Sequence, residues 1–117
     1  MTVTKKLEET RRMRPAPDAE LRKIETALVA ALDSLDQIVT QKIRRQPHAE
    51  LMIDISCAWV GGAEASEGLR AIVDVLPRDV LPADLATGRE TEHDRAELQM
   101  AGTIEGRRFY GRIVLVT

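Results

Sequence analysis

The sequence predicts an α+β fold in which one long N-terminal amphipathic helix packs on an antiparallel sheet of three or four strands. Apolar residues recur at steps of three and four between residues 21 and 38, and residues 49–60 alternate between an apolar set and a mixed set. Residues 95–117 can be paired as a hairpin with one apolar face. A chain of 117 residues has the length of one domain, so we expect a tail at residues 1–17 and a single two-layer domain at residues 18–117.

The predicted tail is basic. It carries five Lys and Arg against two Glu, and it ends in Arg14-Pro15-Ala16-Pro17, where each proline disfavours helical geometry at the residue before it. We expect this tail to be disordered, and a basic arm that reaches nucleic acid is the alternative.

The predicted helix runs from residue 18 to residue 46. Asp18 after Pro17 is a suitable N-cap, and Pro47 ends the helix. A helix of this length spans roughly 43 Å, which exceeds the diameter of roughly 35 Å expected for a domain of this size. The helix must therefore overhang, bend near Asp33, or pack against a second chain, and this is one ground for expecting a homodimer. Its apolar stripe consists of Leu21, Ile24, Leu28, Ala31, Leu35 and Ile38.

A strand is predicted at residues 49–60, with Gly61-Gly62 ending it. Residues 66–76 fit either a strand or a helix, and their β-branched content favours a strand. The prolines and glycine of residues 77–94 predict a long loop. The core-facing set of the first strand is Leu51, Ile53, Ile55, Cys57 and Trp59.

The C-terminal hairpin is predicted with Glu105-Gly106 as its turn. In this register Gly102 lies opposite Phe109, and Leu98 lies opposite Ile113, so that one face is almost wholly apolar. A type I turn with a glycine bulge is the alternative, and it would shift the pairing by one residue. Residues 112–117 end the chain in an apolar run, which we expect at the edge of the sheet, where an exposed strand tends to pair with another chain.

The order of the predicted elements alone indicates a cystatin-like arrangement, in which the sheet curls around the helix. This expectation rests on no motif, and we identify no family in these residues.

Composition excludes several classes of protein. The net charge of −2 argues against a strongly basic nucleic-acid binder, and the single cysteine, Cys57, cannot form an internal disulfide. The sequence shows no signal peptide and no apolar run near the roughly 20 residues that span a bilayer. We therefore expect a cytoplasmic protein with no membrane partner. The excess of Arg over Lys, 13 to 4, indicates a GC-rich source such as an actinobacterium or one of its phages.

Catalytic motifs are absent from the sequence. It contains no G-x-S-x-G elbow, P-loop or G-x-G-x-x-G segment. Cys57 shares a strand face with apolar residues, which is typical of a buried, inert thiol. The acidic loop lacks the spacing of known metal sites, so we predict no metal, no cofactor and no enzymatic activity. Its candidate ligands are Glu90, Glu92, His93 and Asp94.

Asp54 stands out because a carboxylate within a strand needs water or a cation on its face. We expect solvent there. A pairing with a second acid such as Glu97, which would suit general acid–base chemistry, is the alternative.

The last strand carries the most suggestive surface feature. Arg108, Tyr110 and Arg112 alternate onto one face, with Arg107 beside them at the turn. Tyr and Arg dominate the energetics of many protein interfaces, and together they also suit nucleic-acid binding. We therefore expect a small non-enzymatic protein–protein interaction or regulatory protein, a small accessory protein whose partner is a protein. A nucleic-acid-binding module using the same face is the alternative. The identity of the partner, the biological process and a ligand site between helix and sheet stay open.

Overall fold

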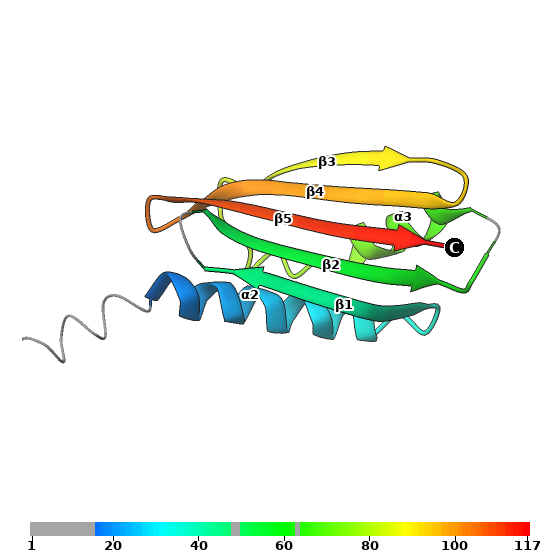
Figure 1. The fold of residues 1–117 in the computed structure, drawn as a ribbon, viewed down its shortest axis with the longest axis horizontal. Helices are drawn as coiled ribbons and strands as arrows, with labels where there is room; N and C mark the ends of the chain where they lie inside the picture. Colours follow the sequence, from blue (N-terminus) through cyan, green and yellow to red (C-terminus); the bar gives the residue numbers. More distant parts are fainter. Residues whose placement is uncertain (1–15, 48–49, 63) are drawn as a thin grey trace, which may run out of the picture.

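The structure, a computed structural model, describes residues 16–47, 50–62 and 64–117. This part of the chain forms two helices and a five-stranded mixed sheet, which confirms the α+β class. The strand order is β1-β2-β5-β4-β3, and both helices lie on one face of the sheet (Figure 1). The elements are α2 (Ala16–Asp33), β1 (Ile38–Gln46), β2 (Leu51–Trp59), α3 (Ala65–Val75), β3 (Ala86–Thr91), β4 (Arg95–Ile104) and β5 (Arg107–Val116).

The prediction of one helix over residues 18–46 is wrong beyond Asp33. The chain leaves the helix at Ser34, whose hydroxyl donates to the Ala31 carbonyl at 2.6 Å, and it returns as β1, antiparallel to β2. Two features of β1 conceal a strand in the sequence: Ile38 continues the helical spacing, and Arg45 interrupts the apolar alternation of the inward face. Arg45 is accommodated there because its Nη1 lies 2.7 Å from the Glu25 carboxylate of α2.

Helix α2 begins at Ala16, two residues before the predicted start. The rest of the predicted tail, residues 1–15, lies outside the described residues, as does His48.

The hairpin prediction is confirmed pair by pair. Gly102 lies opposite Phe109 and Leu98 opposite Ile113. Glu105 and Gly106 both have positive φ, 51° and 80°, as a two-residue type I′ turn requires. The bulged alternative is not adopted.

The position of β5 corrects the expected sheet. This strand lies at the centre, antiparallel to β4 and parallel to β2, so the sheet is neither purely antiparallel nor limited to four strands. The C-terminal strand is therefore not an edge strand, and α2, with 18 residues, spans only about 27 Å. Both grounds on which the sequence predicted a homodimer are removed.

Two further segments differ from prediction. Residues 65–75 form α3 rather than a strand, and β3 occupies part of the predicted loop. Gly68 lets α3 approach the sheet closely, because a Cβ there would fall 2.8 Å from Cδ2 of Trp59 and would also collide with Leu115. Strand β3 is exposed along its whole length, so it carries no buried apolar residue that could reveal it in the sequence.

The hydrophobic core lies between the helices and the inner face of the sheet. The apolar stripe of α2 packs on β1 and β2, and the buried face of α3 packs on β4 and β5. The odd-numbered residues of β2 are all buried. The curl of the sheet around one helix expected from a cystatin-like arrangement stays a prediction. Within the described residues, no helix combines the length and the apolar character needed to cross a membrane. The core of α2 and α3 consists of Leu21, Ile24, Leu28, Leu32, Ala65, Leu69 and Ile72.

Candidate functional site

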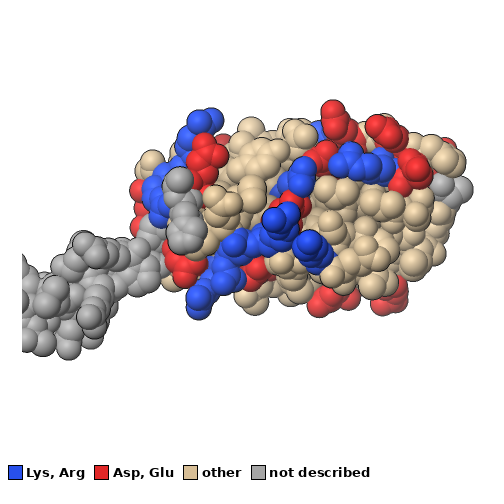
Figure 2. All heavy atoms as spheres, in the orientation of Figure 1, with Lys and Arg blue, Asp and Glu red and all other residues tan. Residues whose placement is uncertain are grey.

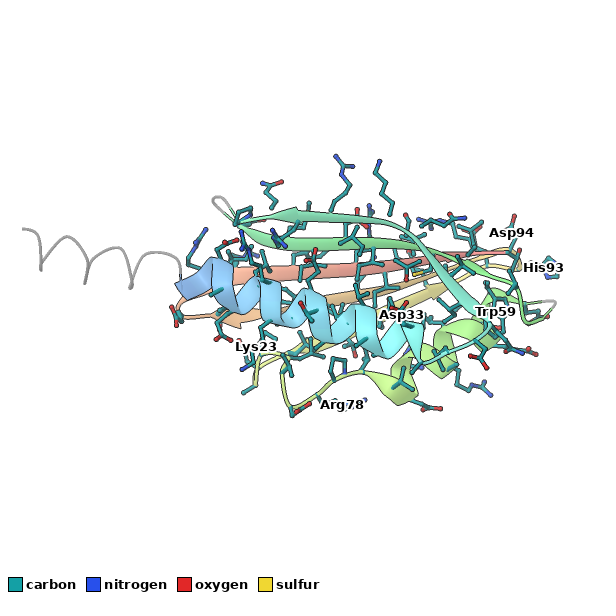
Figure 3. The ribbon with its side chains drawn as sticks, turned by 90° about the horizontal axis from the view of Figure 1, so that it is seen from below. Lys23, Asp33, Trp59, Arg78, His93 and Asp94 are labelled. Carbon is teal, nitrogen blue, oxygen red and sulfur yellow. The ribbon has the colours of Figure 1, made fainter. Side chains whose placement is uncertain are left out.

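The face of the sheet that turns away from α2 and α3, here called the outer face, carries three of the predicted site residues. Arg108, Tyr110 and Arg112 project from alternate positions of β5 onto this face, because Phe109 and Gly111 between them, and Ile113 after them, are buried. In the described part of the chain both helices lie behind the sheet (Figures 1 and 3), so neither of them covers these side chains.

Arg112 is the centre of an ion-pair cluster that joins three strands. Its Nη2 lies 2.6 Å from Oδ2 of Asp54 on β2, and its Nε lies 3.5 Å from Oε1 of Glu97 on β4. The two carboxylates are largely buried, with side-chain exposures of 13% for Asp54 and 7% for Glu97. The hydrogen bond from Arg112 to Asp54 raises the pKa of the guanidinium, which therefore stays charged and neutralises its acidic neighbours.

The prediction that Asp54 faces solvent is wrong, because its largely buried carboxylate meets the Arg112 guanidinium instead. Asp54 and Glu97 are brought to the same arginine, and Arg95 also approaches Glu97, at 3.6 Å. Charge-assisted contacts of this kind fix the geometry of the three side chains.

Arg108 and Tyr110 are accessible members of the predicted site that are not held by a short ion pair, whereas the Arg112 side chain, 40% exposed, is bound to Asp54. The Arg108 side chain is 84% exposed, and its ion pair with Glu50 is long, at 3.8 Å. Tyr110 is 38% exposed and stands between Met52 of β2 and Ala101 of β4 in the strand register.

Arg107 lies apart from these three residues. It is paired with Ile104 at the start of β5, and its Nη2 donates to the Pro47 carbonyl at 3.1 Å. This hydrogen bond connects the hairpin turn to the residue that follows β1. Arg107 therefore belongs to the turn region and not to the outer face.

Basic residues of β1 also belong to the outer face. The sequence-based prediction missed them, because it assigned residues 18–46 to a helix. Lys42 pairs with Ser56 and Arg44 pairs with Asp54, so both residues share the outer side. Figure 2 shows the Lys and Arg side chains as an oblique band across this face, with uncharged surface on both sides of it.

The uncharged surface at the far end of the face is apolar. Val39, Ala58 and Val116 lie in one row across β1, β2 and β5, and the exposed fractions of Val39 and Val116 are 51% and 45%. Val60 follows Ala58 on the same side of the chain, one strand pair further along, where its N–H donates to the Gln37 carbonyl. The outer face thus has an apolar end, a charged centre, and a second end with Met52, Tyr110 and Ala101.

The acidic loop forms the end of the β3–β4 hairpin. His93 and Asp94 lie at this end of the molecule (Figure 3), and the Asp94 carbonyl accepts a hydrogen bond from the Thr117 N–H at 3.0 Å. Within residues 16–47, 50–62 and 64–117, no group of three or more His, Cys, Asp or Glu is placed to hold a metal ion.

The Cys57 thiol is buried on the inner face, as the sequence predicts. Burial raises its pKa to about 11, so the reactive thiolate is scarce near neutral pH.

The helix side carries a cavity of about 210 Å³ beside the loop that follows α3, between Leu76 and Thr87. This volume is below the roughly 300 Å³ at which pockets for small ligands begin. Comparison with protein-family models and with curated proteins gives no match.

Proposed function

We propose that this chain is a small, non-enzymatic interaction protein that binds another protein through the outer face, with Arg108 and Tyr110 as its main contacts. The observation that carries this proposal is the exposed Tyr110 on the central strand of a sheet face that neither described helix covers. Tyrosine and arginine supply most of the binding energy at many interfaces.

The ion-pair cluster supports a role as a rigid platform. Arg112 holds Asp54 and Glu97 across three strands, so these side chains are already ordered before a partner arrives. Preordered contacts lower the entropic cost of association. In this proposal Arg112 is a positioning residue that holds Asp54 and Glu97 in place, while Arg108 and Tyr110 contact the partner.

The double substitution Arg108→Ala and Tyr110→Ala tests the proposal. Both side chains are at least one-third exposed and neither is in the core, so we expect an unchanged fold. Binding of a partner captured from the native host should weaken by about 30-fold, equivalent to about 2 kcal/mol.

The matched control is Lys23→Ala with Arg78→Ala, which also removes two exposed side chains but on the helix side (Figure 3). Calorimetric titration with the partner measures the affinities of the wild type, the Arg108/Tyr110 variant and the Lys23/Arg78 variant. Only the Arg108/Tyr110 variant should bind more weakly than the wild type. Equal affinity for the wild type and the Arg108/Tyr110 variant would rule out the outer face as the binding surface.

A nucleic-acid-binding module is the second candidate, and the band of Lys and Arg on the outer face is the observation that favours it (Figure 2). The carboxylates of Asp54 and Glu97 within this band oppose a polyanion. Binding to a random single-stranded oligonucleotide that weakens steeply with salt would favour this candidate over the protein partner.

A further inference from the structure

We infer that a second copy of this chain docks on the outer face, with the twofold axis of the dimer parallel to β5. This inference rests on the proposed function, because it names one partner of the same face. Strand β5 is the middle of the five strands, so such an axis places β1 of one copy over β3 of the other and β2 over β4.

Side-chain size differs between the two halves of the outer face. In two cross-strand rows the edge strand β1 carries the long side chains of Gln46 and Arg44 where the opposite edge strand β3 carries Ala86 and Gly88. In the first of these rows Met52 of β2 also corresponds to the small Ala101 of β4. The proposed axis lays these long side chains of each copy over the small ones of the other, which is the alternation that allows two layers to interdigitate.

Charge follows the same division. Lys42 and Glu90 stand at opposite edges of one row, which crosses the sheet through Ser56, Val114 and Glu97. Rotation about β5 keeps each row at its own height, so Lys42 of one copy comes over the partner's Glu90, and the reverse contact forms by symmetry. Complementary charges at such contacts fix the orientation of an interface.

The axis also brings the outward residues of β5 beside their own mates. Tyr110 meets Tyr110, and Val116 meets Val116, which buries exposed apolar surface in both copies. Arg108 and Arg112 meet their own mates as well. Each Arg112 guanidinium is already flanked by Asp54 and Glu97, and each Arg108 lies 3.8 Å from Glu50, so these carboxylates offset the repulsion.

The edges of the sheet disfavour the other symmetric route, which is pairing of edge strands. Strand β1 is interrupted by a bulge between Thr40 and Lys42, and β3 has only six residues. Bulges and short edge strands both protect against pairing with another chain.

The area of the outer face suits a dimer. Five strands about 4.8 Å apart and roughly 30 Å long present about 700 Å². Two such faces bury about 1,400 Å² in total, which is the size of a typical stable interface. A second copy and another protein would compete for this face, so the dimer cannot bind the other protein through it.

A charge exchange tests the inference. Lys42→Glu places two acids over each other in the dimer, and Glu90→Lys places two cations over each other. Sedimentation should show association of the wild type at about 500 µM, and each single variant should associate about tenfold more weakly. An equal mixture of the two variants should recover the affinity of the wild type. In the mixed dimer the introduced glutamate of one copy lies over the introduced lysine of the other, and the remaining contact is the native pair of Lys42 and Glu90.

The control is Lys23→Glu, which reverses an exposed charge on α2, behind the sheet (Figure 3), and should associate like the wild type. A wild-type mass of 13 kDa at every concentration would overturn the dimer, and so would a mixture that associates no better than its components. Neither result affects the proposed function, which fails only if loss of Arg108 and Tyr110 leaves the binding of a different protein unchanged.

Discussion

Arg112 joins three strands that are far apart in the sequence, since it lies on β5 while its acidic partners Asp54 and Glu97 lie on β2 and β4. The hairpin register alone places Gln99 opposite Arg112, and this pair was predictable. The contact with Asp54 was not, because it depends on the parallel pairing of β2 with β5, which no local pattern encodes.

Replacing Arg112 with Ala should lower the free energy of unfolding by about 1–2 kcal/mol, because the largely buried Asp54 loses its cation and Glu97 keeps only Arg95. The matched control, Arg108→Ala, removes an arginine that is 84% exposed and should change stability by less than about 0.5 kcal/mol. Urea unfolding of both variants measures the difference. Equal losses would mean that the cluster adds no stability.

The turn residue Glu105 has a φ of 51°, which is unfavourable for glutamate and well tolerated by asparagine. Glu105→Asn should therefore stabilise the protein, with a rise in Tm of about 3 °C or more. Glu92→Asn is a suitable control, because Glu92 is not among the described residues with positive φ. A Tm that falls, or that rises equally in both variants, would argue against strain at this turn.

The elements that alternate strictly were predictable, and those with mixed faces were not. Strand β2 buries every second residue, and the hairpin pairs one apolar face around a two-residue turn, so local sequence determines both. Strand β1 escaped prediction because its inward Arg45 is balanced by Glu25 of α2, a contact that exists only after folding. Helix α3 was ambiguous because its β-branched residues Ile72, Val73 and Val75 fit a strand equally well.

Gly68 gives α3 its place on the sheet. Gly68→Ala should destabilise the protein by about 1 kcal/mol or more, because the added methyl group collides with Trp59 and Leu115, and this cost exceeds the gain in helix propensity. Asp74→Ala, at an exposed position of the same helix, should leave stability unchanged or slightly higher. Thermal unfolding compares the two. A more stable Gly68→Ala variant would show that the helix can move away from the sheet.

The molecule as a whole is asymmetric, with its helices on one face of the sheet and exposed valines, Tyr110 and paired charges on the other. The inner face follows from the apolar periodicity of the sequence. The composition of the outer face could not be predicted without the strand order, because Lys42 and Glu90 share a row only when the five strands assemble.

In the proposed function, the outer face binds other protein surfaces, beginning with a second copy of this chain. Methyl NMR of the valines distinguishes binding at the outer face from binding on the helix side, because valines lie on both sides of the molecule. On raising the concentration from about 20 µM to about 1 mM, the methyl signals of Val39, Val60 and Val116 on the outer face should shift. Those of Val29 on α2 and Val75 on α3 should stay in place. Shifts confined to the helix-side valines would contradict the account.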